Sequence, residues 1–136
     1  MNRDLLRQEL IRDEGLRLKP YRCTQGKLTI GIGRNLDDNG ISNEEAEILF
    51  NNDLRDVESD LDRSLTWWRM MSDARQRVLA NMCFNMGLGT LLTFKNTLAA
   101  MAVGDYQKAA AGMRASLWAR QVGPRADRLI KMMLEG

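Results

Sequence analysis

A change of hydrophobic period near the start of the chain constrains its fold more than any other feature of the sequence. Apolar residues recur at helical spacing over residues 3–13, which predicts an amphipathic helix that ends at Gly15. The segments 17–22 and 28–33 are instead rich in β-favouring residues, and they flank a turn at 23–26. A helix followed at once by a β-hairpin is therefore expected.

Every later periodic segment predicts a helix. Ser42 is a candidate N-cap and Glu45 can complete a capping box, so a long helix is expected from about residue 43 to about residue 62. The segments 35–40 and 87–92 are expected to be loops. Further helices are predicted at about 73–86, 94–103, 106–115 and 124–130, with Ser72, Thr93 and Asp105 as candidate N-caps. The predicted fold class is α+β and mostly helical.

Three side chains at the change of period suggest a catalytic site. Eight residues separate Glu14 from Cys23, and five separate Cys23 from Thr29. Glu14 falls at the end of the predicted helix, where the helix dipole disfavours a negative charge and so favours the protonated form that a general acid needs. Cys23 and Thr29 on the hairpin can hold a water for attack from the other side. A solvated or arginine-paired glutamate is the commoner case at a helix end, so both interpretations stay open.

Length and composition fit one globular domain. A chain of 136 residues with 44% hydrophobic and 28% charged residues can bury a core without disulfides. No apolar run approaches the roughly 18 residues of a membrane span, and no export signal is visible at the N-terminus. Cys23 and Cys83 are therefore expected to be free thiols. A zinc site is not expected in a chain that has no histidine and only two cysteines.

Four ordered segments of the chain resemble the T-even phage lysozyme family, the phage endolysins of glycoside hydrolase type. They are DEGLRLKPY with TIGIGR, SNEEAEILFNNDL, NMCFNMGLGTLLTFKNTL and SLWARQVGPRADRLI, and they cover nearly the whole chain. The resemblance implies a single lysozyme-like domain over residues 1–136, with two lobes and a cleft between them. A small β-hairpin lobe with the long connecting helix would occupy about residues 12–60. The helical lobe would comprise about residues 64–136 together with the N-terminal helix.

The resemblance also implies the residues of the site. It gives catalytic roles to Glu14, Cys23 and Thr29, and it pairs Arg125 with Glu14, although charge alone would make Arg125 an ordinary surface residue. The expected substrate-binding residues are Gly33, where the backbone can be approached closely, and Phe84, Asn85, Met86 and Gly87. From the sequence alone, the last four are core and helix-end positions. Trp118 matches the family's buried tryptophan and is expected to be structural.

Peptidoglycan hydrolysis is the activity that the resemblance implies, at the β-1,4 bond between N-acetylmuramic acid and N-acetylglucosamine. Glu14 would protonate the departing oxygen, while Cys23 and Thr29 hold a water on the opposite face, which gives inversion. The sequence departs from the family pattern in three ways. Cys23 stands where many members have aspartate, Arg34 replaces the usual histidine, and the connection 33–42 is short. Because a thiol is a poorer base than a carboxylate unless thiolate is favoured, activity is predicted to be sensitive to thiol reagents.

Charge is unevenly distributed although the net charge is only +2. Residues 1–65 hold 10 basic and 14 acidic side chains, whereas residues 66–136 hold 10 basic and 4 acidic ones. A basic C-terminal half favours an anionic polymer, and peptidoglycan and nucleic acid both satisfy this condition. The basic residues are scattered over several predicted helices without an aromatic platform, which argues against nucleic acid.

The expected partner is the glycan strand of peptidoglycan, and no cofactor, metal or membrane insertion is expected. The protein is expected to stay in the host cytoplasm until a holin opens the membrane, and then to act on the periplasmic cell wall as a monomer. One alternative is a cell-wall-binding module of the same fold with weakened catalysis. Cys23 makes this alternative conceivable, whereas Glu14 and Thr29 argue against it.

Overall fold

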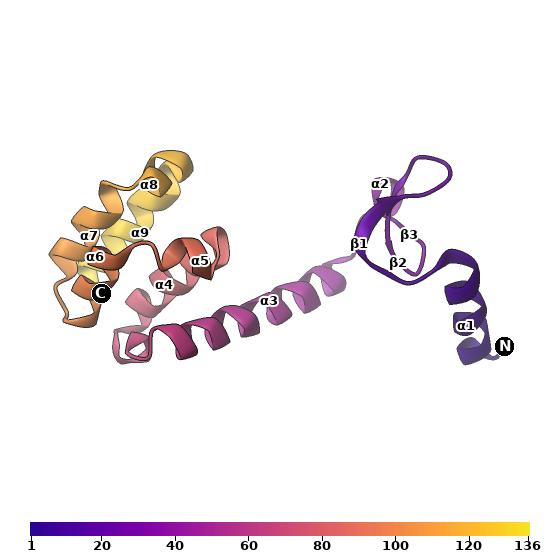
Figure 1. Ribbon diagram of the computed structural model, residues 1–136, viewed down its shortest axis with the longest axis horizontal. Coiled ribbons are helices and arrows are strands. Elements are labelled where there is room, and N and C mark those ends of the chain that lie inside the picture. Colours follow the sequence, from indigo (N-terminus) through magenta and orange to yellow (C-terminus); the bar gives the residue numbers. More distant parts are fainter. The chain divides into compact units, whose positions relative to one another are not determined.

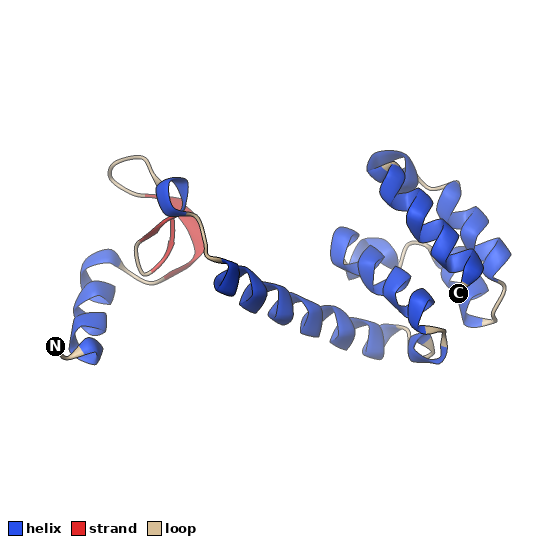
Figure 2. Ribbon diagram, turned by 180° about the vertical axis from the view of Figure 1, so that it is seen from behind, coloured by secondary structure: helices blue, strands red, loops and turns tan.

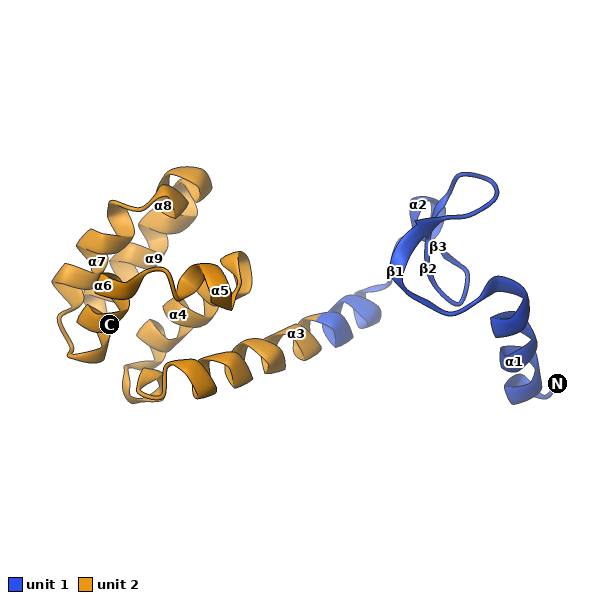
Figure 3. Cartoon of the chain, viewed as in Figure 1, with its two compact units in different colours: residues 1–49 blue, residues 50–136 orange.

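The structure, a computed structural model, describes all 136 residues. It is an α+β fold in which helices predominate and the strands form one small antiparallel sheet, as predicted (Figure 1). The chain forms two compact units, Met1–Leu49 and Phe50–Gly136 (Figure 3). All the strands belong to the first unit, and every element of the second unit is a helix (Figure 2). No helix has both the length and the apolar content that crossing a bilayer requires.

The first unit carries the sheet between two helices. Its elements are α1 (Arg3–Glu14), β1 (Arg17–Arg22), β2 (Leu28–Gly31), β3 (Arg34–Asn35), α2 (Leu36–Asn39) and the first turns of α3 (Asn43–Ser64). Thr29 is the only buried residue of this unit, so the unit has no apolar core of its own. The predicted packing of the N-terminal helix with the helical lobe stays a prediction.

Helix α1 begins and ends where the sequence predicts. The side chain of Asn2 accepts a hydrogen bond from the amide of Leu5 at 3.0 Å, which satisfies one of the free amides at the helix start. Gly15 follows the last residue with φ 83°, and its N–H donates to the carbonyl of Ile11 at 2.8 Å. Glu14 is therefore the final residue of the helix.

The sheet has the order β1-β2-β3, with both pairs antiparallel. Tyr21 of β1 lies opposite Thr29, and Asn35 of β3 lies opposite Thr29 on the other side, so Thr29 is in the central strand. The β1–β2 register is irregular between Arg17 and Tyr21, a stretch that contains Pro20. Proline has no N–H to donate to a ladder, which fits its place in an edge strand.

Strand β3 and helix α2 occupy a segment that was expected to be a loop. The side chain of Asn35 accepts a hydrogen bond from the amide of Asp38 at 3.0 Å, and this bond starts a single helical turn. Gly40, with φ 58°, ends the turn. A two-residue strand and a one-turn helix are too short to produce a hydrophobic period, so the sequence pattern did not predict them.

The long helix α3 begins with the predicted capping box, and an arginine from the sheet joins it. The amide of Glu45 donates to Ser42 Oγ at 3.1 Å, and the amide of Ser42 donates to Glu45 Oε1 at 2.9 Å. Arg34 Nη1 also donates to Glu45 Oε1 at 2.8 Å and to the carbonyl of Gly40 at 3.2 Å. The hydrogen bond from Arg34, followed by that from the Ser42 amide, lowers the pKa of Glu45 from 4.5 to about 2.

The second unit holds the hydrophobic core. After α3 it contains a short 3-10 helix (Trp68–Met70), α4 (Asp73–Met86), α5 (Leu88–Leu91), α6 (Lys95–Ala102), α7 (Tyr106–Arg114), α8 (Leu117–Val122) and α9 (Pro124–Glu135). Helix α7 packs against α6 and α9, and α9 also packs against α4 and α8. The largest fully buried side chains are Leu61, Leu79, Met82, Leu91, Met101, Met113, Met133 and Val78. Four of these eight side chains are methionines, whose flexible side chains can fill irregular spaces in the core.

Two of the three predicted N-caps in the second unit are confirmed. Ser72 accepts a hydrogen bond from the amide of Arg75, and Asp105 accepts one from the amide of Lys108. The prediction for Thr93 is wrong, because its hydroxyl donates to the carbonyl of Thr90 and so closes the turn after α5. Residues 88–91, which were expected to be part of a loop, form α5.

Arg34→Ala is expected to raise the pKa of Glu45 from about 2 toward 4.5, because it removes the strongest hydrogen bond to the carboxylate. A folded-state pKa below the unfolded value means that Glu45 stabilises the fold above about pH 4.5, and that this contribution is lost as the pH falls through about 2. NMR titration of the Glu45 carboxyl carbon measures the change. Arg7→Ala, which removes an exposed arginine of the same unit, is the control and should leave the Glu45 midpoint in place.

Candidate active site

Glu14 lies directly against the backbone of Gly33. Gly33 is in the turn between β2 and β3 and has φ 72°. A side-chain Cβ at this position would be only 3.2 Å from Cγ and Oε2 of Glu14 and 3.3 Å from its Cβ. Contacts this short are tighter than most, so a methyl group here would press on the Glu14 side chain and require it to move by a few tenths of an ångström. The positive φ favours glycine at position 33, and the close approach of Glu14 adds to that preference.

The close approach that was expected at Gly33 is made by the protein's own Glu14. Gly31, the last residue of β2, also has a positive φ of 70°, but a Cβ there would meet no atom within 4 Å. Of these two glycines, only Gly33 lies where a side chain would press on a neighbouring residue. The substrate-binding role expected for Gly33 stays a prediction, and the observed contact gives this residue a structural role beside it.

Cys23 begins the turn that joins β1 to β2. Its amide donates to the carbonyl of Lys27 at 2.9 Å, and its carbonyl accepts from the amide of Gly26 at 2.8 Å. The thiol is half-buried and is not part of a disulfide. Hydrogen bonding from the backbone amide of Gln25, and then from that of Lys27, lowers the pKa of the Cys23 thiol, while partial burial opposes this effect. The turn therefore favours the thiolate that a base requires.

Thr29 is held close to this thiol by the central strand. Its side chain is buried, and Oγ1 donates to the carbonyl of Lys27 at 2.9 Å. A hydrogen bond from the same hydroxyl to Cys23 also contributes to the lowered thiol pKa. Because a hydroxyl has one proton, it can serve either the Lys27 carbonyl or the sulfur at a given moment. Thr29 therefore lies close enough to Cys23 to affect its thiol, and the catalytic roles of both residues stay predictions.

The predicted substrate-binding residues of the second unit lie at the end of α4. Phe84 and Asn85 are exposed, Met86 is half-buried, and Gly87 ends the helix with φ 83°. Asn85 Oδ1 accepts a hydrogen bond from the indole nitrogen of Trp118 at 2.9 Å. Since an indole N–H is a donor only, the carboxamide oxygen must face the tryptophan and the Nδ2 group must face away.

Trp118 is buried, as expected, but it has a second role that the sequence did not reveal. Its N–H fixes the orientation of the exposed Asn85 carboxamide from within the core. A buried tryptophan usually finds an acceptor for its N–H, so the sequence could have suggested that Trp118 has a partner, but not which residue it is. The two residues are 33 positions apart in the sequence, so nothing local indicated the partner.

Arg125 is in the first turn of α9 and contacts α4. Its Nε and Nη2 atoms both donate to Asn81 Oδ1, at 3.0 and 2.7 Å. This forked contact explains how the guanidinium is held within the second unit. The ion pair of Arg125 with Glu14 stays a prediction.

A small antiparallel sheet after a first helix, a long helix that runs from one unit into the next, and an all-helical second unit define the lysozyme-like class of folds. The sequence profile described as Phage lysozyme matches residues 12–132. The chain belongs to the phage lysozyme family.

Three relatives illustrate the range of this similarity. The pre-baseplate central spike protein Gp5 of Enterobacteria phage T4 is 37% identical over 155 aligned positions, covering 93% of this chain and 27% of that protein. Probable T4-type lysozyme 1 of Dictyostelium discoideum is 30% identical over 154 positions, covering 91% of this chain and 90% of that protein. The endolysin of Acyrthosiphon pisum secondary endosymbiont phage 1 is 33% identical, covering 74% of this chain and 68% of that protein.

The alignments with the first two relatives are longer than this chain, so these relatives contain residues in the matched region that this chain lacks. This difference agrees in direction with the short connection predicted between Gly33 and Ser42. Its location in that connection, and the replacement of a family aspartate by Cys23, stay predictions.

Gly33→Ala is expected to destabilise the protein by about 1–3 kcal/mol from backbone strain alone, and to displace the Glu14 side chain as well. Gly31→Ala is the matched control, because it has nearly the same positive φ and no neighbouring atom. Urea denaturation measures the stability, and the carboxyl chemical shift of Glu14 reports its displacement. If the two variants were equally destabilised and left the Glu14 shift unchanged, the contact would be without consequence.

Proposed function

We propose that this protein is a muramidase that hydrolyses the β-1,4 bond between N-acetylmuramic acid and N-acetylglucosamine in peptidoglycan. The observation that carries the proposal is the arrangement of Glu14 on Gly33 together with the paired Cys23 and Thr29 on the same sheet, in a member of the phage lysozyme family. Inverting glycoside hydrolysis needs a proton donor and a base, and Glu14 and the Cys23 thiolate can supply these two groups.

Glu14 acts as the general acid. Its carboxylic acid gives a proton to the glycosidic oxygen as the bond between that oxygen and the anomeric carbon breaks. The contact with Gly33 limits where the carboxyl group can go, which favours a productive direction for the proton. Arg125 supports the carboxylate that remains after proton transfer.

Cys23 acts as the base toward a water on the opposite face of the sugar. The thiolate takes a proton from the water while the water oxygen bonds to the anomeric carbon, and the configuration inverts. Thr29, fixed by its hydrogen bond to Lys27, orients that water. At the end of the step Cys23 is a thiol and Glu14 a carboxylate, and proton exchange with solvent restores both.

The helical unit supplies substrate contacts in this proposal. The Nδ2 group of Asn85 faces away from Trp118 and donates to the carbonyl of an N-acetyl group. Phe84, Met86, Gly87 and Gly33 provide the surface along which the glycan strand lies.

The biological role that we propose is host lysis and phage release. The protein stays in the host cytoplasm until a holin opens the membrane, and it then acts as a monomer on the cell wall. A second setting is a phage particle, because the central spike protein, a baseplate component by its name, is similar over 93% of this chain. Mass spectrometry of purified virions separates these settings, since only the second places the protein in the particle.

Clearing of purified Gram-negative peptidoglycan, followed by turbidity, tests the activity. Glu14→Gln is expected to reduce the rate by roughly a hundredfold to ten-thousandfold, because it removes the general acid. Asp13→Asn, a change at the neighbouring exposed carboxylate, is the matched control and should retain activity.

Alkylation of Cys23 should abolish or sharply reduce clearing, and so should Cys23→Ala. Peptide mass spectrometry verifies that Cys23 is modified and that the buried Cys83 is not. Wall binding without clearing by the wild type would support the alternative of a binding module.

Cys23→Asp tests the role of residue 23 as the base. The base must be deprotonated, and an aspartate ionises at a pKa of about 3.9 whereas a thiol does so at about 8.5 before the lowering described above. The rising limb of the pH–rate profile for kcat should therefore move to lower pH in this variant. A rising limb that stays in place would show that it belongs to another group and that residue 23 is not the base.

A further inference from the structure

The peptide group between Lys27 and Leu28 is the common support of Cys23 and Thr29. Its carbonyl oxygen accepts the N–H of Cys23 at 2.9 Å and the hydroxyl of Thr29 at 2.9 Å. The N–H of the same peptide group donates to Asp37 Oδ2 at 2.7 Å. Since a peptide group is planar and rigid, a bond that fixes its N–H also fixes the direction of its carbonyl. Asp37 is therefore linked to Cys23 and Thr29 through the rigid Lys27–Leu28 peptide group.

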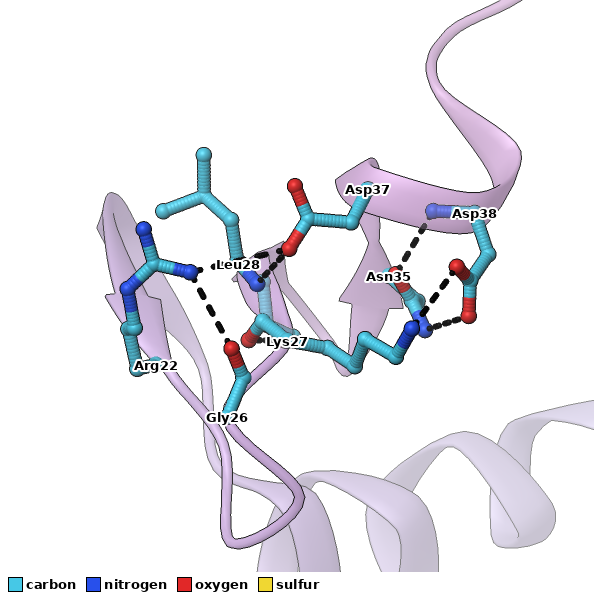
Figure 4. Close-up of polar contacts among 8 residues, drawn as sticks. Arg22, Gly26, Lys27, Leu28, Asn35, Asp37 and Asp38 are labelled. Atoms are coloured by element: carbon cyan, nitrogen blue, oxygen red, sulfur yellow. Dashed lines mark hydrogen bonds and ion pairs between the residues drawn. The ribbon is translucent and has the colours of Figure 1, made fainter.

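The short third strand explains why a side chain has this role. Strand β3 consists of Arg34 and Asn35, which lie opposite Ile30 and Thr29, so the ladder ends before it reaches Leu28. The Leu28 N–H faces α2 instead of a strand, and the Asp37 carboxylate takes the place of the missing carbonyl (Figure 4). A hydrogen bond to a carboxylate is roughly twice as strong as one to a neutral acceptor.

Asp38 adds a second connection from α2 to the turn. Its Oδ1 atom lies 3.1 Å from Lys27 Nζ, and its Oδ2 atom accepts from Asn35 Nδ2 at 2.9 Å (Figure 4). On the other side of the turn, Arg22 Nη1 donates to the carbonyl of Gly26 at 3.0 Å and lies 3.7 Å from Asp37 Oδ2. Ion pairs this exposed contribute little by themselves, so the bond of Asp37 to the backbone is the main support.

We propose that Asp37, assisted by Asp38, is a positioning residue that holds the Lys27–Leu28 peptide group and thereby places the Cys23 thiol and the Thr29 hydroxyl for reaction. The consequence for catalysis rests on the proposed function. The placement of the thiol does not rest on it, because the alkylation rate of Cys23 reports this placement without any catalytic activity.

Removing Asp37 can change the pKa of the Cys23 thiol in two opposite directions. The direction of the change therefore shows whether Asp37 acts by holding the peptide group or only through its negative charge. The charged side chains that hold the turn containing Cys23 are Arg22 on β1, Lys27 in the turn, and Asp37 and Asp38 on α2. Loss of a nearby negative charge alone would lower the pKa of Cys23, because an anion disfavours thiolate. Loss of the support would loosen the turn and withdraw the amides of Gln25 and Lys27 from the sulfur, which would raise the pKa.

The experiment compares wild type, Asp37→Ala, Asp37→Asn and Glu47→Ala. Glu47 is an exposed carboxylate of the same unit without a hydrogen-bond partner, so its variant controls for charge. The first readout is the rate of Cys23 alkylation by iodoacetamide as a function of pH, measured by peptide mass spectrometry. The second is kcat and KM for peptidoglycan clearing. Far-UV circular dichroism checks that each variant is folded.

Asp37→Ala is expected to move the midpoint of alkylation to higher pH and to lower kcat by roughly tenfold to a hundredfold, as misplaced catalytic groups do, with KM changed less than about twofold. Asp37→Asn keeps an acceptor for the Leu28 N–H, so it should recover most of kcat and leave the midpoint unchanged or slightly lower. Glu47→Ala should match wild type in both readouts.

An alkylation midpoint that is unchanged or lower in folded Asp37→Ala would overturn the proposal, since Asp37 would then act at most through its charge. If Asp37→Ala fails to fold, Asp37→Asn tests the proposal instead. If this variant loses as much kcat as Cys23→Ala does, then an acceptor for the Leu28 N–H is not sufficient to position the site, and the proposal is wrong. If wild type alkylates as expected but clears no wall, the proposed function fails while the alkylation profiles still decide the role of Asp37.

Discussion

The contact between Glu14 and Gly33 is the constraint on which the rest of the site depends. It joins the last residue of α1 to the turn of the sheet, and the lack of a side chain at position 33 leaves room for it. The central strand of that sheet contains Thr29, and the turn before it contains Cys23. The three predicted catalytic side chains thus come from one short stretch of chain, in which a helix end, a hairpin and a glycine turn follow one another directly.

The two units are stabilised in different ways. The second unit has an extensive apolar core, whereas the first buries only Thr29 and is held by hydrogen bonds from side chains to the backbone. Arg34 and Glu45 connect the sheet to α3, and Asp37 connects α2 to the hairpin. Hydrogen bonds are directional, whereas apolar burial tolerates small shifts. A unit built in this way can fix the direction of a thiol or hydroxyl without a large core. Loss of a single hydrogen bond, however, is expected to disturb such a unit more than it would disturb a unit with an extensive core.

Local signals made much of this structure predictable. A cap or a helix-ending glycine acts within four residues, so Asn2, Gly15 and the Ser42–Glu45 box could be identified from their neighbours alone. Glu14, Cys23 and Thr29 were predicted as catalytic residues from their spacing and from the family resemblance. Their supports were not, because predicting that Asp37 accepts from Leu28 requires the register and the end of a two-residue strand. Thr93 shows the opposite failure. Its hydroxyl could accept from an amide and cap a helix, but it donates to the carbonyl of Thr90 and closes a turn instead.

The hydrogen bond from Trp118 to Asn85 gives one surface position a fixed polarity. A free asparagine can rotate its carboxamide and offer either a donor or an acceptor, so it recognises little by itself. Here the oxygen is held toward Trp118, so the Nδ2 donor faces away from the core toward any ligand that meets Asn85. A carbonyl group is matched and a bare N–H is not. A selective choice between ligand groups is therefore made by a residue that no ligand needs to touch.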